Sequence, residues 1–173
     1  TSNNLLLLKR NLVIIYLLLF CGLRREELLS LQVRDIDLER KLLNVRGESS
    51  KSGRHRQVPL HSTVLLFLKD YLNTRKHYTT PYLIVSSESD KGLSRDGLRH
   101  LVLRLRRQSG VAFHLHQFRH TFAVNFLHTS NNLAKLQQLL GHRSIAMTLL
   151  YVRCLPVQTM REDIETMHLD TFI

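Results

Sequence analysis

Residues 5–28 read LLLLKRNLVIIYLLLFCGLRREEL and determine how the chain begins to fold. Apolar side chains dominate this stretch up to Gly22, a residue suited to the left-handed turn that ends a helix. The pattern predicts a buried helix over residues 3–21, followed by a shorter helix over residues 25–31. The fold is therefore expected to begin with a long core helix.

The remainder of the chain alternates less apolar segments with polar turns. Residues 36–38, 42–45 and 57–60 are short strand-like pieces that predict a small antiparallel sheet, with Pro59 at a strand end or sheet edge. Residues 82–85 are a further strand candidate. Helical spacing of apolar residues predicts more helices near residues 64–72, 98–105, 117–128, 133–140, 145–149 and 160–168. We expect one mainly α domain with a small antiparallel β-sheet (α+β) over residues 1–173.

Several sequence features indicate the cellular compartment of the chain. Residues 9–11 are polar and leave only residues 12–20 as an uninterrupted apolar run, whereas a bilayer-spanning helix needs about 20 residues. No small-residue cleavage site follows, so we expect neither a signal peptide nor a membrane partner. Cys21 and Cys154 are too few for a disulfide framework, which favours a reducing, cytoplasmic setting.

The overall charge points to a polyanionic partner. The 173 residues carry 25 Lys and Arg against 14 Asp and Glu, a net charge of +11 with a pI of about 10.3. So strong a positive charge on a small domain favours nucleic acid as the partner, and an anionic membrane surface second.

Residues 114–120, HLHQFRH, are the densest cluster of chemically active side chains. His116 and His120 share a helical face as two metal ligands would, but Gln117 stands where a zinc protease needs a glutamate base, and Arg119 would repel a cation. His116 and Arg119 also share a face, which suits an anion. An exposed basic helix without a ligand is the third reading.

Three other segments are ambiguous alone. The sequence LLGH ending at His142 is followed nine residues later by Tyr151, and both reach one ligand only if the chain bends between them, for instance at an N-cap at Ser144. Arg24 begins a helix, with Glu27 one turn later to orient it. Lys51 lies in a basic hairpin loop, KSGRHR, that solvent alone would explain.

Together these four segments resemble the catalytic domain of the tyrosine recombinase (phage integrase) family, over about residues 5–155. The segments GLR-x-x-EL, Lys51 before R-x-VPL, HxxRHTFA, and LLGH with a tyrosine nine residues on follow the family's order and spacing. Arg25 and Glu26 depart from the family's usual apolar and small pair there. The resemblance implies a fold like that of type IB topoisomerases and six catalytic residues: Arg24, Lys51, His116, Arg119, His142 and Tyr151.

The resemblance also implies a role for each of these residues. Tyr151 attacks a DNA phosphodiester and forms a 3′-phosphotyrosyl intermediate, with no metal, cofactor or ATP. The two arginines neutralise the transition state and His142 donates a hydrogen bond to it. Lys51 protonates the leaving oxygen and His116 accepts or relays the tyrosine proton. Glu27 is implied as a supporting residue that orients a catalytic partner.

Double-stranded DNA is the implied partner, with Arg54 and Arg56 as candidate contacts and self-association to a tetramer on DNA. Further candidate contacts are His55, Arg75, Arg99, Arg104, Arg106 and Arg107. The resemblance implies an N-terminal DNA-binding domain that this chain lacks, a tail over 155–173 that packs on a neighbouring protomer, and a place at the nucleoid. Three alternatives stay open: a type IB topoisomerase-like relaxase, a non-catalytic DNA-binding module and a zinc hydrolase.

Overall fold

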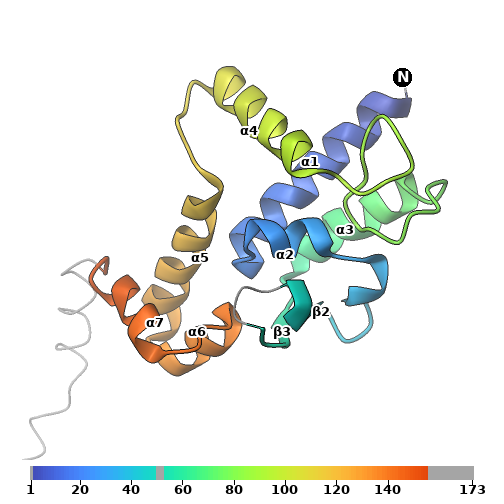
Figure 1. Ribbon diagram of the computed structural model, residues 1–173. Coiled ribbons are helices and arrows are strands. Elements are labelled where there is room, and N and C mark those ends of the chain that lie inside the picture. The colour runs from blue at the N-terminus through green and yellow to red at the C-terminus, as the bar shows by residue number, and fades with distance from the viewer. Residues whose placement is uncertain (1, 50–52, 156–173) are drawn as a thin grey trace, which may run out of the picture.

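The computed structural model describes residues 2–49 and 53–155, which form helices around a small sheet (Figure 1). The elements, in chain order, are α1 (Ser2–Cys21), α2 (Arg25–Ser30), the 3₁₀ helix η1 (Val33–Asp35), β1 (Ile36–Asp37), β2 (Leu42–Val45), the 3₁₀ helix η2 (Gly47–Ser49), β3 (Arg56–Pro59), α3 (Ser62–Thr74), α4 (Arg95–Ser109), α5 (Leu115–Ser130), α6 (Leu133–Leu140) and α7 (Ile145–Val152). The prediction of a mainly helical fold with a small antiparallel sheet is confirmed. The helix predicted over residues 160–168 lies outside the described residues.

Helix α1 is the central element of the larger core. It packs along α3 and α5 and buries Val13, Leu17 and Leu18 almost completely. Contrary to the expectation from its polar interruption, the 18 residues Asn4–Cys21 are long and apolar enough, by length and composition alone, to cross a membrane. The core helix of a soluble protein passes the same test, and the packing of α1 against two helices is that of a core helix.

The sheet has the order β1-β2-β3 with both pairs antiparallel. Leu43 pairs with Val58 and Val45 with Arg56, so the side chains of Arg56 and Val58 both point into the protein while Gln57 between them is exposed. Pro59 ends β3, as predicted. This register has a consequence for the site, because it buries a charged side chain beside the core.

The strand candidate at residues 82–85 does not form a strand. Leu83, Ile84 and Val85 are buried, but the segment makes only isolated bridges, at Tyr82 and at Val85. The hydroxyl of Tyr71 replaces a partner strand, since it donates to the carbonyl of Leu83 (3.1 Å) and accepts from the amide of Val85 (3.2 Å). An irregular buried segment is stable when its backbone groups are paired in this way.

A second, smaller core lies in α5, α6 and α7, which sit together on one side of the molecule in Figure 1. Its fully buried apolar members are Ala123, Leu127, Leu136 and Leu140, and Tyr151 is 8% exposed at its edge. Helix α5 also packs on α1 and so joins the two cores. Residues from both cores meet at the junction, and the candidate site is there.

Candidate active site

Glu27 lies at the centre of a buried cluster of arginines. Its carboxylate is completely buried and receives two hydrogen bonds from Arg56, each 2.8 Å, in a fork-to-fork pair. It also accepts from the backbone amide of Arg24 (2.8 Å) and from the Arg24 guanidinium (3.0 Å). Burial alone would raise the pKa of Glu27, but the hydrogen bonds and positive charge of Arg56 outweigh it and lower the pKa to about 2. Glu27 is therefore an anion that holds guanidinium groups in place.

The C-terminal end of α6 accepts hydrogen bonds from the same arginines. Arg56 Nε donates to the carbonyl of Leu139 (2.6 Å), and the carbonyl of Leu140 accepts from Arg119 (2.8 Å) and Arg24 (3.4 Å). The last carbonyls of a helix lack partners within the helix and carry partial negative charge, so cations are favourable there. Three arginines distant in sequence are thus drawn to one helix end.

Arg119 is the largest fully buried side chain of the described residues, at 1% exposure. Besides Leu140, it donates to the carbonyl of Gly22 (2.6 Å) and contacts His142 Nε2 (3.0 Å). Burial and the neighbouring charge of Arg24 lower the pKa of Arg119 to about 10, so the guanidinium stays charged at neutral pH. Its fork is held between the turn that follows α1, which supplies the carbonyl of Gly22, and the end of α6.

His142 lies in the turn between α6 and α7, where the chain bends at Gly141 (φ 62°) and α7 begins after Ser144, whose side chain caps the amide of Ala146. The ring is buried, with Nδ1 2.9 Å from the hydroxyl of Thr148. Burial, with the charges of Arg119 and Arg24, lowers the pKa of His142 to about 4. The imidazole is neutral at pH 7.

Tyr151 follows on α7 and faces His142. The two rings are stacked, with centroids 6.2 Å apart and planes inclined by 8°, and the centroid of the His120 ring lies 5.4 Å from that of the Tyr151 ring. The bend at residues 141–144 therefore brings together two side chains that an unbroken helix would place on opposite faces.

Five of the residues implied by the resemblance share this cluster: Arg24, Glu27, Arg119, His142 and Tyr151. His116 is exposed one turn before Arg119 and has no hydrogen bond to another described side chain. Lys51 lies outside the described residues. Arg54 is exposed, as a DNA contact requires.

Arg56 corrects the sequence-based expectation. It was expected as an exposed DNA contact, but its side chain is only 5% exposed and all three of its nitrogen positions are engaged by Glu27 and Leu139. Its alternation with Val58 in β3 was the sequence signal for burial. Arg75, another expected contact, is also buried, and donates to the carbonyls of Thr80 and Tyr82.

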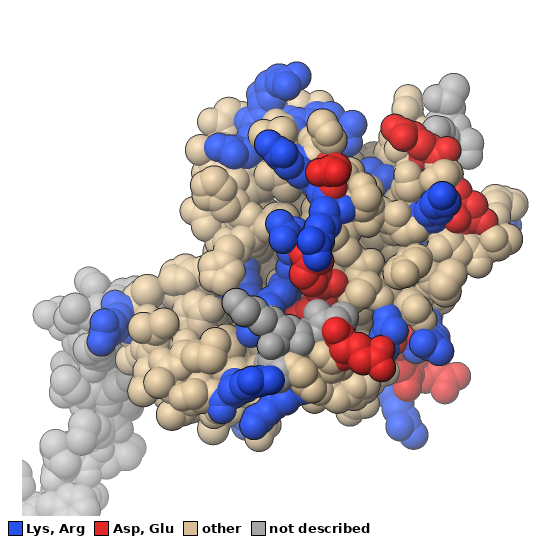
Figure 2. Space-filling view, viewed as in Figure 1, with Lys and Arg blue, Asp and Glu red and all other residues tan. Residues whose placement is uncertain are grey.

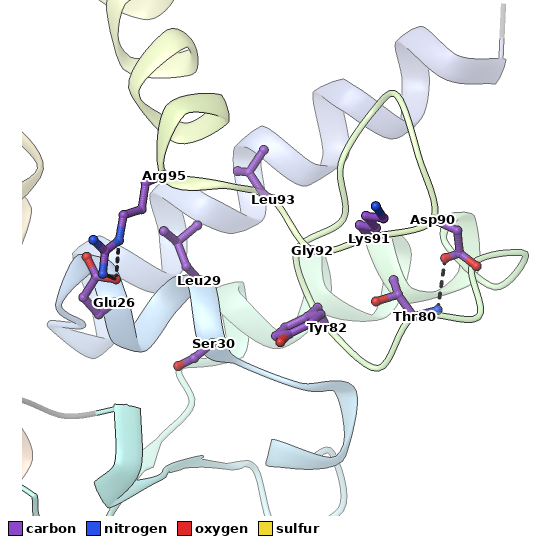
Figure 3. Close-up of a pocket in the computed structure, with 10 residues that line it drawn as sticks. All are labelled: Glu26, Leu29, Ser30, Thr80, Tyr82, Asp90, Lys91, Gly92, Leu93 and Arg95. Atoms are coloured by element: carbon purple, nitrogen blue, oxygen red, sulfur yellow. Dashed lines mark hydrogen bonds and ion pairs between the residues drawn. The ribbon is translucent and has the colours of Figure 1, made fainter.

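One surface pocket lies elsewhere and contains none of these residues. It has a volume of about 480 Å³ between α2 and the segment before α4, and the ion pair of Glu26 with Arg95 lies on its rim (Figure 3). Thr80, Tyr82 and Asp90 line its far side. Arg25 and Glu26, which depart from the family's usual pair, thus form ion pairs at the surface.

Charge on the face shown in Figure 2 is strongly uneven. Lys and Arg side chains gather over α4 and continue down the middle of the face toward α2. Within α4, Arg99, Arg104 and Arg107 are exposed, and the Arg95–Glu26 ion pair ties the start of α4 to α2. Among the described residues, no group of three or more His, Cys, Asp or Glu side chains could hold a metal ion.

Comparison with known proteins places the chain in a family. The model of the phage integrase family matches residues 4–156. Tyrosine recombinase XerA of Pyrococcus horikoshii is 34% identical over 158 residues, which cover 90% of this chain and 54% of that protein. Tyrosine recombinase XerC of Alcanivorax borkumensis is 37% identical over 161 residues, which cover 87% of this chain and 50% of that protein. The chain spans about half the length of these curated relatives.

Solved structures agree. The crystal structure of XerA recombinase matches with a TM-score of 0.77 at 29% identity and covers 93% of this chain and 61% of its own. XerH site-specific recombinase, in a post-cleavage complex with palindromic difH substrate, matches with a TM-score of 0.73 at 25% identity over 91% of this chain and 46% of its own. With the family model matching nearly its whole length and relatives above 30% identity, the chain belongs to the phage integrase family of tyrosine recombinases.

Proposed function

We propose that this chain is the catalytic domain of a site-specific DNA recombinase that cleaves and rejoins DNA through a phosphotyrosine. The observation that supports this most strongly is the convergence of two guanidinium groups, a neutral imidazole and a phenol around the end of α6, although their residues span positions 24–151. The named recombinases among the relatives, and XerH in complex with its DNA substrate, support the same reaction.

In the proposed reaction, the Tyr151 oxygen attacks the phosphorus and the P–O5′ bond breaks. This leaves a 3′-phosphotyrosine and a free 5′-hydroxyl, so the energy of the phosphodiester is kept for rejoining. The transition state gathers negative charge on the non-bridging oxygens, which Arg24 and Arg119 would neutralise with permanently charged planar forks. Glu27 supports them by fixing Arg24 from two directions.

Two proton transfers complete the proposal. Lys51 protonates the leaving 5′ oxygen and His116 accepts or relays the proton of Tyr151, as the resemblance implies. A tyrosine with a pKa of about 10 is a weak nucleophile at neutral pH unless charge and a base assist it. The His120 ring also lies beside Tyr151, with the two ring centroids 5.4 Å apart.

The proposed partner is double-stranded DNA, on which copies of the protein assemble as a tetramer in the cytoplasm, at the nucleoid. The exposed basic face of α4 and Arg54 supply positive charge for phosphate contacts. The proposed packing on a neighbouring protomer concerns the tail over residues 155–173, of which residues 156–173 lie outside the described part of the chain. The DNA-binding domain that precedes the catalytic domain in the family would supply further contacts to the DNA.

The test is a covalent-adduct assay on a nicked duplex whose binding site is first selected from random sequences. We expect the wild-type chain to form a protease-sensitive DNA adduct in the presence of a metal chelator. Tyr151→Phe should form none and bind the duplex with nearly unchanged affinity, since only the nucleophilic oxygen is removed. Binding without cleavage or adduct would instead indicate a DNA-binding module, and cleavage without an adduct that stops in chelator would indicate a metal-dependent hydrolase. Relaxation of supercoiled plasmids lacking the site would indicate a relaxase.

A further inference from the structure

Thr148 is buried against the site without any assigned role. It is 0% exposed in α7, and its Oγ1 lies 2.9 Å from His142 Nδ1. The neighbouring apolar residues Met147, Leu149 and Leu150 are all exposed by 45% or more. An amphipathic helix normally places its apolar residues inside and its polar residues outside. Helix α7 reverses this arrangement at Thr148, so a polar contact accounts for the position better than packing does.

The neighbours of His142 fix its tautomer. Its Nε2 faces Arg119 Nη2 at 3.0 Å, and a charged guanidinium carries donors only. Nε2 must therefore accept, which places the proton of the neutral ring on Nδ1. The Nδ1–H group then donates to the hydroxyl of Thr148. In this state Nε2 has no hydrogen to give.

Phosphate binding reverses the requirement on the ring. If Arg119 turns its Nη2 donor to a phosphoryl oxygen, Nε2 loses its donor and can bond the same phosphate only by carrying a hydrogen. In a neutral ring, Nε2 then takes up a proton and Nδ1 releases one, by exchange with solvent, so Nδ1 becomes an acceptor in need of a donor. A hydroxyl both accepts and donates, so Thr148 can partner Nδ1 in either state. An apolar side chain of the same shape could do so in neither.

We propose that Thr148 is a positioning residue that supports both tautomers of His142, so that Nε2 accepts from Arg119 in the free protein and donates to the scissile phosphate in the DNA complex. The inference rests on the proposed function of the site. The backbone around the ring is held separately, because the Gln137 side-chain amide donates to the carbonyl of His142 (3.3 Å). Replacing the hydroxyl therefore changes the ring's partner while that anchor of the turn remains.

The kinetic test compares three variants on the selected nicked duplex at saturating protein. Thr148→Val keeps the shape and removes the hydroxyl, and we expect it to slow adduct formation about 10-fold or more at unchanged DNA affinity. Thr148→Ser keeps the hydroxyl and should react within about 3-fold of wild type. Thr129→Val makes the same chemical change at an exposed threonine whose hydroxyl bonds only the carbonyl of Asn125, and should react like wild type.

The tautomer is read directly from the ¹⁵N shifts of the His142 ring in the full chain. We expect a protonated Nδ1 in the free wild-type protein, and a protonated Nε2 in Tyr151→Phe bound to the intact duplex. If Thr148 had a purely structural role, Thr148→Val would lower the free energy of unfolding but leave the ¹⁵N shifts of the His142 ring unchanged. If Thr148→Val cleaves as fast as the wild type, the inference is overturned and the proposed function stays intact. A protonated Nε2 in the free wild-type chain would have the same consequence. Absence of any wild-type adduct would overturn the proposed function instead.

Discussion

Glu27 compensates the positive charges of the site. Among the described residues it is the only carboxylate that Arg56 and Arg24 contact. Removing one member of a buried ion pair leaves the other charge without compensation, which costs about 3 kcal/mol or more. We expect Glu27→Gln to lower the free energy of unfolding at pH 7 by about 3 kcal/mol, measured by chemical denaturation. Glu26→Gln, one residue away at a 41%-exposed ion pair, should cost less than about 1 kcal/mol. Equal losses in the two variants would contradict the role given to Glu27.

The same carboxylate predicts a pH dependence. Its pKa of about 2 in the folded chain lies below the ordinary value of 4.5, so the unfolded chain binds the proton more tightly. The stabilisation is therefore complete above about pH 4.5 and is lost as the pH falls from there toward 2, by about 3 kcal/mol in total. Denaturation curves between pH 6 and 2 measure this loss. In Glu27→Gln the slope below pH 4.5 should be clearly smaller, and an unchanged slope would count against the assignment.

Arg119 tests whether charge alone or the planar fork matters. Lysine keeps the charge but cannot donate together to Gly22, Leu140 and a phosphate. We expect Arg119→Lys to slow single-turnover cleavage by about 100-fold or more, comparable to the loss of a donor that stabilises a transition state. Arg40→Lys, at a 79%-exposed side chain in the turn between β1 and β2, makes the same chemical change away from the site and should cleave at the wild-type rate. An Arg119→Lys protein that cleaves within about 3-fold of wild type would show that the fork is dispensable.

Among the elements, the junction of α1 and α2 has the strictest requirement on its backbone. Gly22 adopts φ +58°, and a Cβ there would lie 2.4 Å from a ring carbon of Phe122 on α5. Its carbonyl is also the acceptor for Arg119. The turn thus sets both the approach of α5 to α1 and the position of one guanidinium.

Two glycines of similar conformation separate the backbone effect from the close approach. Gly110 ends α4 at φ +70° with nothing within 4 Å of an added Cβ, so Gly110→Ala should cost only about 1 kcal/mol. Gly22→Ala should cost about 2–4 kcal/mol, since the clash adds to the same conformational strain. Thermal or chemical unfolding of the two variants measures the difference. Equal costs would mean that Phe122 moves away freely.

The elements were largely predictable from sequence because their signals are local. Gly22 marks the end of α1 and Ser144 marks the start of α7. The alternation of buried and exposed side chains marks the strand β3. Local patterns failed where a distant group decided the outcome: the Tyr71 hydroxyl pairs the backbone of residues 83 and 85, so an apolar segment is buried without a partner strand. The expectation for Arg56 was wrong for a related reason. Its alternation with Val58 indicates burial, but the buried partner, Glu27, is distant in sequence and is identified only by the fold.

At the scale of the whole molecule, the site forms where the two hydrophobic cores meet. No local sequence pattern predicts how the two cores pack against each other. The order and spacing of the motifs, through the family that they resemble, implied that Arg24, Arg119, His142 and Tyr151 belong together. They did not predict that the end of α6 gathers the arginines, or that the ring partner of His142 is Thr148, because both depend on how α5–α7 dock against α1 and α2.

The exposed arginines of α4 extend the proposed DNA-binding surface beyond the site, and their contribution to DNA affinity can be measured from its salt dependence. Each phosphate contact releases counterions and adds about 0.9 to the slope of log affinity against log salt. If Arg99 and Arg107 each contact a phosphate, the double variant Arg99→Gln/Arg107→Gln should lower the magnitude of that slope by about 2, whatever the DNA sequence. Arg40→Gln, at a 79%-exposed side chain in the turn between β1 and β2, makes the same change away from α4 and should leave the slope as it is. Titrations of labelled duplex from 50 to 200 mM salt compare them, since about that range gives a measurable slope. A double variant with the wild-type slope would place the DNA on another face of the molecule.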